Sequence, residues 1–108
     1  MKTIILMLML FISFQAAGEP AHPCSGDALA RAKKLLVLHF GQDDRIEINQ
    51  SVSVLKPMKN PADNSQLFDV LEVWGNIYKG QYRMHFIYAR QPKGCVLMGQ
   101  EIMEYAKL

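Results

Sequence analysis

Residues 68–88 read FDVLEVWGNIYKGQYRMHFIY, and this stretch decides the fold because it predicts two β-strands joined by a tight turn. Glycine suits the positive φ of a hairpin turn, so we place a two-residue loop at Lys79 and Gly80. With that loop, Tyr78 lies opposite Gln81, and Trp74 lies opposite His85. The hairpin is therefore the centre of the predicted sheet.

This pairing separates the side chains of the hairpin into two chemically different faces. Side chains alternate along a strand, so a slip of one residue in the pairing would mix the two sets. One face is apolar, aromatic or glycine throughout, and we expect it to pack on the core: Leu71 with Tyr88, Val73 with Phe86, Gly75 with Met84, and Ile77 with Tyr82. The opposite face is mixed: Val70 with Ala89, Glu72 with Ile87, Trp74 with His85, and Asn76 with Arg83.

A further strand is predicted on each side of this hairpin. Residues 45–56 alternate regularly, which indicates a strand with one wet side; Ile46, Ile48, Val52 and Val54 point one way, with Gln50 among them. Residues 57–65 contain two prolines and predict a long connecting loop. The last strand begins at Cys95 and ends near Lys107, and a bulge near Gly99 and Gln100 would restore its alternation.

Residues 25–40 predict a helix that precedes all the strands. Ser25 is a suitable N-cap, Asp27 lies in the first turn, and Gly41 follows the end. One side carries the apolar set Ala28, Leu29, Ala32, Leu36 and Phe40. The last two turns are apolar nearly all round, so that end is either sandwiched between the sheet and a loop or left partly exposed; we expect the sandwich.

The first 18 residues have the features of a secretory signal peptide. A short basic start is followed by an apolar run of 11 residues, which is short for a bilayer span, and by small residues at Ala16 and Gly18. We expect residues 19–108 to form a single exported domain, periplasmic or secreted, without a membrane anchor. Loss of Lys2 leaves a formal net charge of +1, which gives no support for a nucleic-acid or membrane partner.

The two cysteines of an exported chain most often form a disulfide. A bond between Cys24 and Cys95 would close a loop of 72 residues, worth about 4 kcal/mol in the chain-entropy model. It would join the start of the helix to the start of the last strand. The predicted class is α+β, with one N-terminal helix packed on a four-stranded antiparallel meander sheet.

The order of one helix followed by four strands resembles the cystatin-like plan, in which a sheet curls around a helix. That plan implies protease inhibitors, small-ligand pockets or interaction modules. The segment Gln50, Ser51, Val52, Ser53, Val54 begins like the QxVxG segment of cystatins, but Val54 stands in place of its glycine. The chain also has no Pro-Trp pair near a second loop, so we expect no cystatin activity.

Catalytic and metal-binding motifs are absent from the sequence. No GxSxG, HExxH, P-loop or GxGxxG pattern occurs, and the histidines and cysteines lack metal-site spacing. Glu72, Arg83 and His85 share the mixed face of the hairpin, and together with Glu101 or Glu104 they are the one candidate group for acid–base work. A solvated charge ladder is the commoner reading of such a cluster on an open sheet. We expect no enzyme activity, no cofactor and no metal.

The mixed face is the predicted binding surface. A tryptophan among apolar neighbours with an arginine at the edge has the composition of an interface hot spot. We expect its partner to be a cell-envelope protein, such as an enzyme that the chain inhibits, or a second copy of the chain. The alternative is a small apolar ligand held between sheet and helix. The predicted contact residues are Val70, Glu72, Trp74, Asn76, Arg83, His85 and Ile87.

Overall fold

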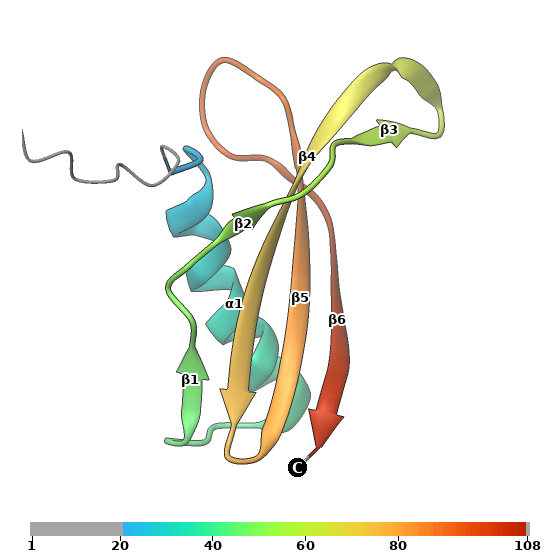
Figure 1. The fold of residues 1–108 in the computed structure, drawn as a ribbon. Helices are drawn as coiled ribbons and strands as arrows, with labels where there is room; N and C mark the ends of the chain where they lie inside the picture. Colours follow the sequence, from blue (N-terminus) through green and yellow to red (C-terminus); the bar gives the residue numbers. More distant parts are fainter. Residues whose placement is uncertain (1–20, 108) are drawn as a thin grey trace, which may run out of the picture.

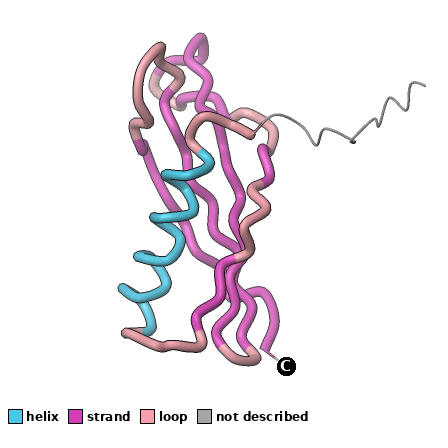
Figure 2. The backbone as a smooth tube through the Cα atoms, turned by 90° about the vertical axis from the view of Figure 1, so that its left-hand side faces the viewer, coloured by secondary structure: helices cyan, strands magenta, loops and turns pink. Residues whose placement is uncertain are grey.

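The computed structural model describes residues 21–107, so the predicted signal peptide lies outside the described residues. A single helix, α1 (Ser25–Phe40), packs against one face of an antiparallel sheet (Figures 1 and 2). The predicted α+β class and the order of helix before sheet are therefore confirmed. Within the described part of the chain, no helix is long and apolar enough to cross a membrane.

The sheet has six strands where four were predicted. The central hairpin is β4 (Asp63–Ile77) and β5 (Gly80–Ala89), and the last strand is β6 (Leu97–Lys107). The predicted first strand is divided into β1 (Ile46–Ile48) and β2 (Ser53–Val54), and both pair with β4. The three-residue β3 (Met58–Asn60) also pairs with β4. The short strands β1, β2 and β3 therefore form one interrupted edge of the sheet beside β4, and the order across the sheet is β1-β4-β5-β6.

Polar side chains cause the break between β1 and β2. Asn49 Oδ1 accepts a hydrogen bond from the Ser51 backbone N–H, and Gln50 Nε2 donates to the Ile48 carbonyl. Such local bonds compete with the regular strand ladder. The pairing with β4 shifts by two residues across this segment, from Ile48 opposite Gly75 to Ser53 opposite Glu72.

The predicted loop at residues 57–65 is wrong. β3 and the first residues of β4 form a hairpin, and Pro61 and Ala62 make its turn. Asn60 Oδ1 accepts from the Ala62 N–H, and Asn60 Nδ2 donates to Gln66 Oε1. The proline occupies the turn itself, so it leaves the strand pairing on either side intact.

The central hairpin keeps its predicted faces but not its predicted partners. Ile77 lies opposite Gly80, so the turn is made by Tyr78 and Lys79, and Tyr78 has a φ of +53°. This pairing differs from the predicted one by two residues. A shift of two preserves the alternation of faces, so the apolar set still faces α1 while each residue has a different partner.

The register of β6, which the sequence left open, is interrupted twice. The irregularities lie at Met98, next to the predicted bulge at Gly99, and at Tyr105. Between them the pairing is regular and places Glu101 opposite His85 and Ile102 opposite Met84. Ile102 therefore packs against the core, while Glu101 lies on the opposite face.

The core lies between α1 and the inner face of the sheet. Its largest fully buried side chains come from both layers: Leu36, Leu71, Val73, Met84, Phe86 and Tyr88. Ala28 and Ala32 let the helix approach the sheet closely. The predicted disulfide between Cys24 and Cys95 is present, with the two Cα atoms 5.7 Å apart.

Two predictions for the helix ends are wrong. Cys24, rather than Ser25, is the N-cap residue, and no side chain caps that end. The C-terminal end is not sandwiched, because Leu38 is 76% exposed and Phe40 is 48% exposed, with the Phe40 ring against Tyr82 at 4.6 Å. Gly41 does end the helix, with a φ of +81° and its N–H donating to the Val37 carbonyl.

Candidate functional site

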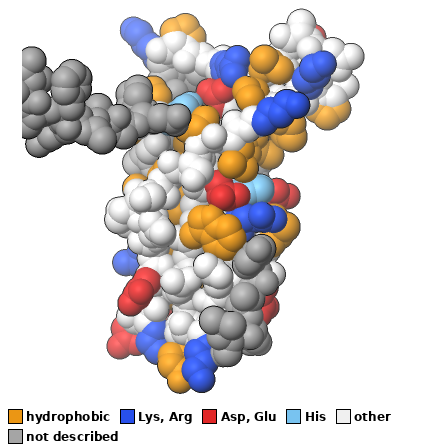
Figure 3. Space-filling model, in the orientation of Figure 1, with side chains coloured by type: hydrophobic (Ala, Val, Ile, Leu, Met, Phe, Trp, Pro, Cys, Tyr) orange, Lys and Arg blue, Asp and Glu red, His pale blue; other side chains and the backbone are white. Residues whose placement is uncertain are grey.

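All seven predicted contact residues lie on β4 and β5, on the face of the sheet turned away from α1, which we call the outer face. The cross-strand pairs on it are Asn76 with Gln81, Trp74 with Arg83, Glu72 with His85, and Val70 with Ile87. The predicted pairing of Trp74 with His85 is therefore wrong. Figure 3 shows acidic, histidine and basic side chains gathered over the middle of this face, beside hydrophobic ones.

His85 joins the three longest strands of the sheet at the centre of this face. Its Nε2 atom lies 2.8 Å from Glu72 Oε2 on β4, and its Nδ1 atom lies 2.7 Å from Glu101 Oε1 on β6. Ionised carboxylates only accept hydrogen bonds, so the imidazolium form of His85 satisfies both contacts by donating from both nitrogens. The side chains of His85 and Glu72 are 15% and 14% exposed, whereas Glu101 is 56% exposed.

Trp74 and Arg83 extend this cluster toward the hairpin turn. The Trp74 indole N–H donates to Glu72 Oε1 at 3.0 Å, which fixes the orientation of a half-buried ring. The Arg83 guanidinium carbon lies 5.9 Å from the centre of that ring, and Arg83 Nε lies 3.9 Å from Glu72 Oε2. Arg83 also donates to the Met103 sulfur of β6 at 3.8 Å. Glu72 thus holds His85, Trp74 and Arg83 in one ordered group.

The remaining predicted contact residues differ in how accessible they are. Asn76 is exposed and Ile87 is half-buried, but Val70 is only 9% exposed. Val70 therefore offers a partner little surface. The accessible part of the outer face is centred on Trp74, Arg83 and Asn76, with Glu101 contributed by β6.

The acid–base reading of the cluster is disfavoured by its geometry. A general base needs a ring nitrogen within hydrogen-bond reach of a substrate proton, and both nitrogens of His85 already contact carboxylates. Among the described residues, no group of three or more histidine, cysteine or acidic side chains is arranged to hold a metal ion. The arrangement is suited to presenting an ordered surface.

Two carboxylates on the other side of the sheet hold the layers together. Partial burial opposes ionisation of Asp27, but hydrogen bonds from Arg31 and from the buried Tyr88 hydroxyl outweigh it and lower the pKa of Asp27. Burial of the Tyr88 phenol and its bond to Asp27 raise the pKa of Tyr88. Burial likewise opposes ionisation of Asp69, yet bonds with His22 and Arg90 lower its pKa.

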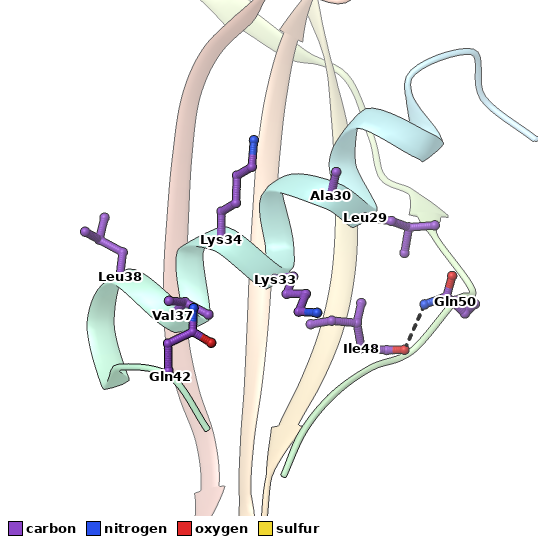
Figure 4. A pocket seen from close by; sticks show the side chains of 9 residues that line it. All are labelled: Leu29, Ala30, Lys33, Lys34, Val37, Leu38, Gln42, Ile48 and Gln50. Atoms are coloured by element: carbon purple, nitrogen blue, oxygen red, sulfur yellow. Dashed lines mark hydrogen bonds between the residues drawn. The ribbon is translucent and has the colours of Figure 1, made fainter. Parts of the chain in front are cut away.

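The sequence did not predict a groove that runs along α1 beside the edge strand β1. Its volume is about 670 Å³, and Figure 4 shows side chains from the helix on one wall and Ile48 and Gln50 on the other. Leu29, Val37 and Ile48 are half-buried, and Leu38 is exposed. The groove depends on where the helix lies against an interrupted strand, and neither feature is visible in the periodicity of the sequence. The other lining residues are Ala30, Lys33, Lys34 and Gln42.

Comparison of the chain with protein-family models, with curated proteins and with solved structures finds no match in any of the three. The chemistry of the outer face and of the groove is therefore the basis for proposing what this chain binds.

Proposed function

We propose that this chain is a small exported protein without enzymatic activity, which binds another protein through the outer face of its sheet. The observation that carries the proposal is the ordered group of Trp74, Arg83 and Glu72 at the middle of that face. Tryptophan and arginine are the residues most enriched at interface hot spots. A ring already fixed by a hydrogen bond loses little conformational freedom when a partner covers it.

Export is supported by the disulfide, because such bonds persist mainly in oxidising compartments. The bond between Cys24 and Cys95 agrees with the secretory signal predicted at residues 1–18. The absence of catalysis is supported by His85, whose ring nitrogens both contact carboxylates. The partner that these features favour is a protein of the cell envelope, such as an enzyme that the chain inhibits, or a second copy of the chain.

Site-specific photo-cross-linking in the exporting cell tests this proposal. A photoreactive amino acid at Asn76, which is exposed on the outer face, is expected to form one discrete adduct, whose mass identifies either an envelope protein or the chain itself. The same amino acid at Lys93, which is exposed in the loop before β6, serves as the control and is expected to give no such adduct.

Two variants connect the adduct to the surface. Trp74→Ala is expected to abolish it, and the circular dichroism spectrum shows whether this variant still folds. Asn76→Arg adds bulk at an exposed position without removing a packed side chain, so the unlabelled variant is expected to compete at least tenfold less well for the partner. An adduct that persists with folded Trp74→Ala, or equal cross-linking from Lys93, would contradict the proposal.

A further inference from the structure

The free edge of β1 forms one wall of the groove along α1. β1 is the terminal strand in the order β1-β4-β5-β6, so among the described strands none pairs with its other edge. α1 lies against the same end of the sheet and contributes Leu29 and Val37 to the opposite wall, while Leu38 lines the groove but projects away from Ile48 (Figure 4). A strand edge beside an apolar groove under a helix has the layout that peptide-binding domains use for strand addition.

The backbone of Ile48 points toward this free edge. The Asn49 N–H donates to the Trp74 carbonyl at 2.9 Å, so the polar backbone groups of Asn49 face β4. Successive residues of a strand direct these groups to opposite sides, which turns the N–H and C=O of Ile48 outward. The side-chain amide of Gln50 donates to the Ile48 carbonyl at 3.1 Å. That amide occupies the place where the N–H of an added strand would bind.

The charge of the groove favours an acidic occupant. Lys33 extends from α1 toward the Ile48 wall (Figure 4), and it makes no ion pair with any residue whose side chain the structure describes. The adjoining Lys34 adds a second positive charge at the rim. A two-fold pairing of β1 edges from two copies would bring these lysines together, which disfavours a second copy as the occupant.

We propose that the groove between α1 and β1 binds an extended peptide segment of a partner protein as an added β-strand. The strand pairs with the backbone of Ile48, places alternate apolar side chains against Leu29, Val37 and Leu38, and sets a carboxylate against Lys33. This site shares no residue with the group around Trp74. It therefore stands or fails independently of the function proposed for the outer face.

Selection of nine-residue random peptides displayed on phage against the oxidised protein provides the probe. We expect enriched peptides to alternate β-branched or other apolar residues with polar ones and to carry an aspartate or glutamate. For a synthetic copy of the most enriched peptide, fluorescence anisotropy is expected to show at least tenfold weaker binding to Leu38→Glu and to Lys33→Glu. Binding to the control variant Lys93→Glu, which makes the same charge change at an exposed loop position, is expected to change less than twofold.

Backbone methylation of the peptide separates strand addition from burial of an apolar chain. N-methylation of the peptide amide that donates to the Ile48 carbonyl is expected to weaken binding at least tenfold, whereas N-methylation at either neighbouring position, whose N–H points away from β1, has little effect. Gln50→Ala frees the Ile48 carbonyl and is expected to tighten binding by two- to fivefold. The proposal would be overturned if no peptide is enriched or if all methylated peptides bind equally well. It would also be overturned if dodecanoate binds saturably and displaces the peptide while methylation of the peptide has no effect on its affinity.

Discussion

Gly75 is the residue at which the helix layer meets β4 with no side chain between them. A Cβ atom at this position would lie 2.8 Å from Leu36 Cδ1, 3.1 Å from Met84 Cε and 3.3 Å from Ile48 Cδ1. Leu36 and Met84 are fully buried, so neither side chain has free space to move into. The glycine is required here for space, since its φ is not positive.

Gly75→Val is therefore expected to lower the free energy of unfolding by about 1–3 kcal/mol, the usual cost of overpacking a core. Urea unfolding followed by circular dichroism measures the change. The matched control is Gly26→Ala, since a Cβ at Gly26 in the first turn of α1 meets nothing within 4 Å; that variant is expected to be neutral or more stable by up to about 1 kcal/mol. Wild-type stability of Gly75→Val would mean that the inner face of β4 is wrongly assigned.

Asp27 connects α1 to the sheet, because its carboxylate accepts a hydrogen bond from the Tyr88 hydroxyl on β5. Its pKa in the folded protein is lowered from 3.8, so the folded state binds this proton more weakly than the unfolded chain does. The stabilising contribution is therefore fully present above pH 3.8 and is lost as the pH falls through the folded pKa. Asp27→Asn is expected to lower Tm at pH 7, with the difference from wild type narrowing below pH 3.8. Thermal melts across this range measure the effect. A difference in Tm between wild type and Asp27→Asn that stayed constant or grew on acidification would contradict a stabilising role of the ionised carboxylate.

Among the elements, the central hairpin is the one whose two faces were predicted correctly and whose cross-strand partners were not. The face of every residue from Val70 to Ile77 was predictable, because alternation survives a register error of two. The cross-strand partner of each residue was not predictable from the preference of hairpin turns for glycine, which placed Gly80 in the loop to supply a positive φ. Gly80 is instead required for space, since a Cβ there would lie 2.7 Å from the Tyr82 hydroxyl. Cross-strand chemistry contained the missing signal: the observed register opposes Glu72 to His85 and Trp74 to Arg83.

The turn at Tyr78 and Lys79 has a direct energetic test. Among the described residues, Tyr78 is the sole non-glycine residue with a positive φ. Asparagine tolerates this region and isoleucine does not. Tyr78→Asn is therefore expected to be more stable than Tyr78→Ile by about 1–2 kcal/mol. Comparing two variants at one position cancels the loss of the contacts of Tyr78 with Arg45 and Lys79.

The same pair of substitutions at Lys79 is the control, because φ at Lys79 is not positive. There asparagine is expected to give no comparable advantage in the free energy of unfolding. An advantage of asparagine at Lys79 and none at Tyr78 would restore the turn at Lys79 and Gly80 and, with it, the register predicted from the sequence.

At the scale of the molecule, one helix covers one face of the sheet, and the disulfide fixes the end of that helix to the segment before β6. This arrangement follows from features that the sequence displays: the helix, the strand alternation and the cysteine pair. The interruption of the edge strand does not, because it depends on local bonds made by Asn49 and Gln50. That interruption also limits the free edge to short stretches, which guards a small sheet against uncontrolled pairing.

Acrylamide quenching of Trp74, the one tryptophan of the chain, measures whether the outer face is an open and ordered contact surface. A protein of residues 19–108 with the disulfide formed is measured first as a monomer, established by sedimentation, and then with the cross-linked partner or at concentrations where the chain self-associates. We expect intermediate quenching of the monomer, because the indole is half-buried, and at least a twofold lower quenching constant in the complex. Complete protection of the indole in the monomer, or the same quenching constant in both states, would contradict this expectation.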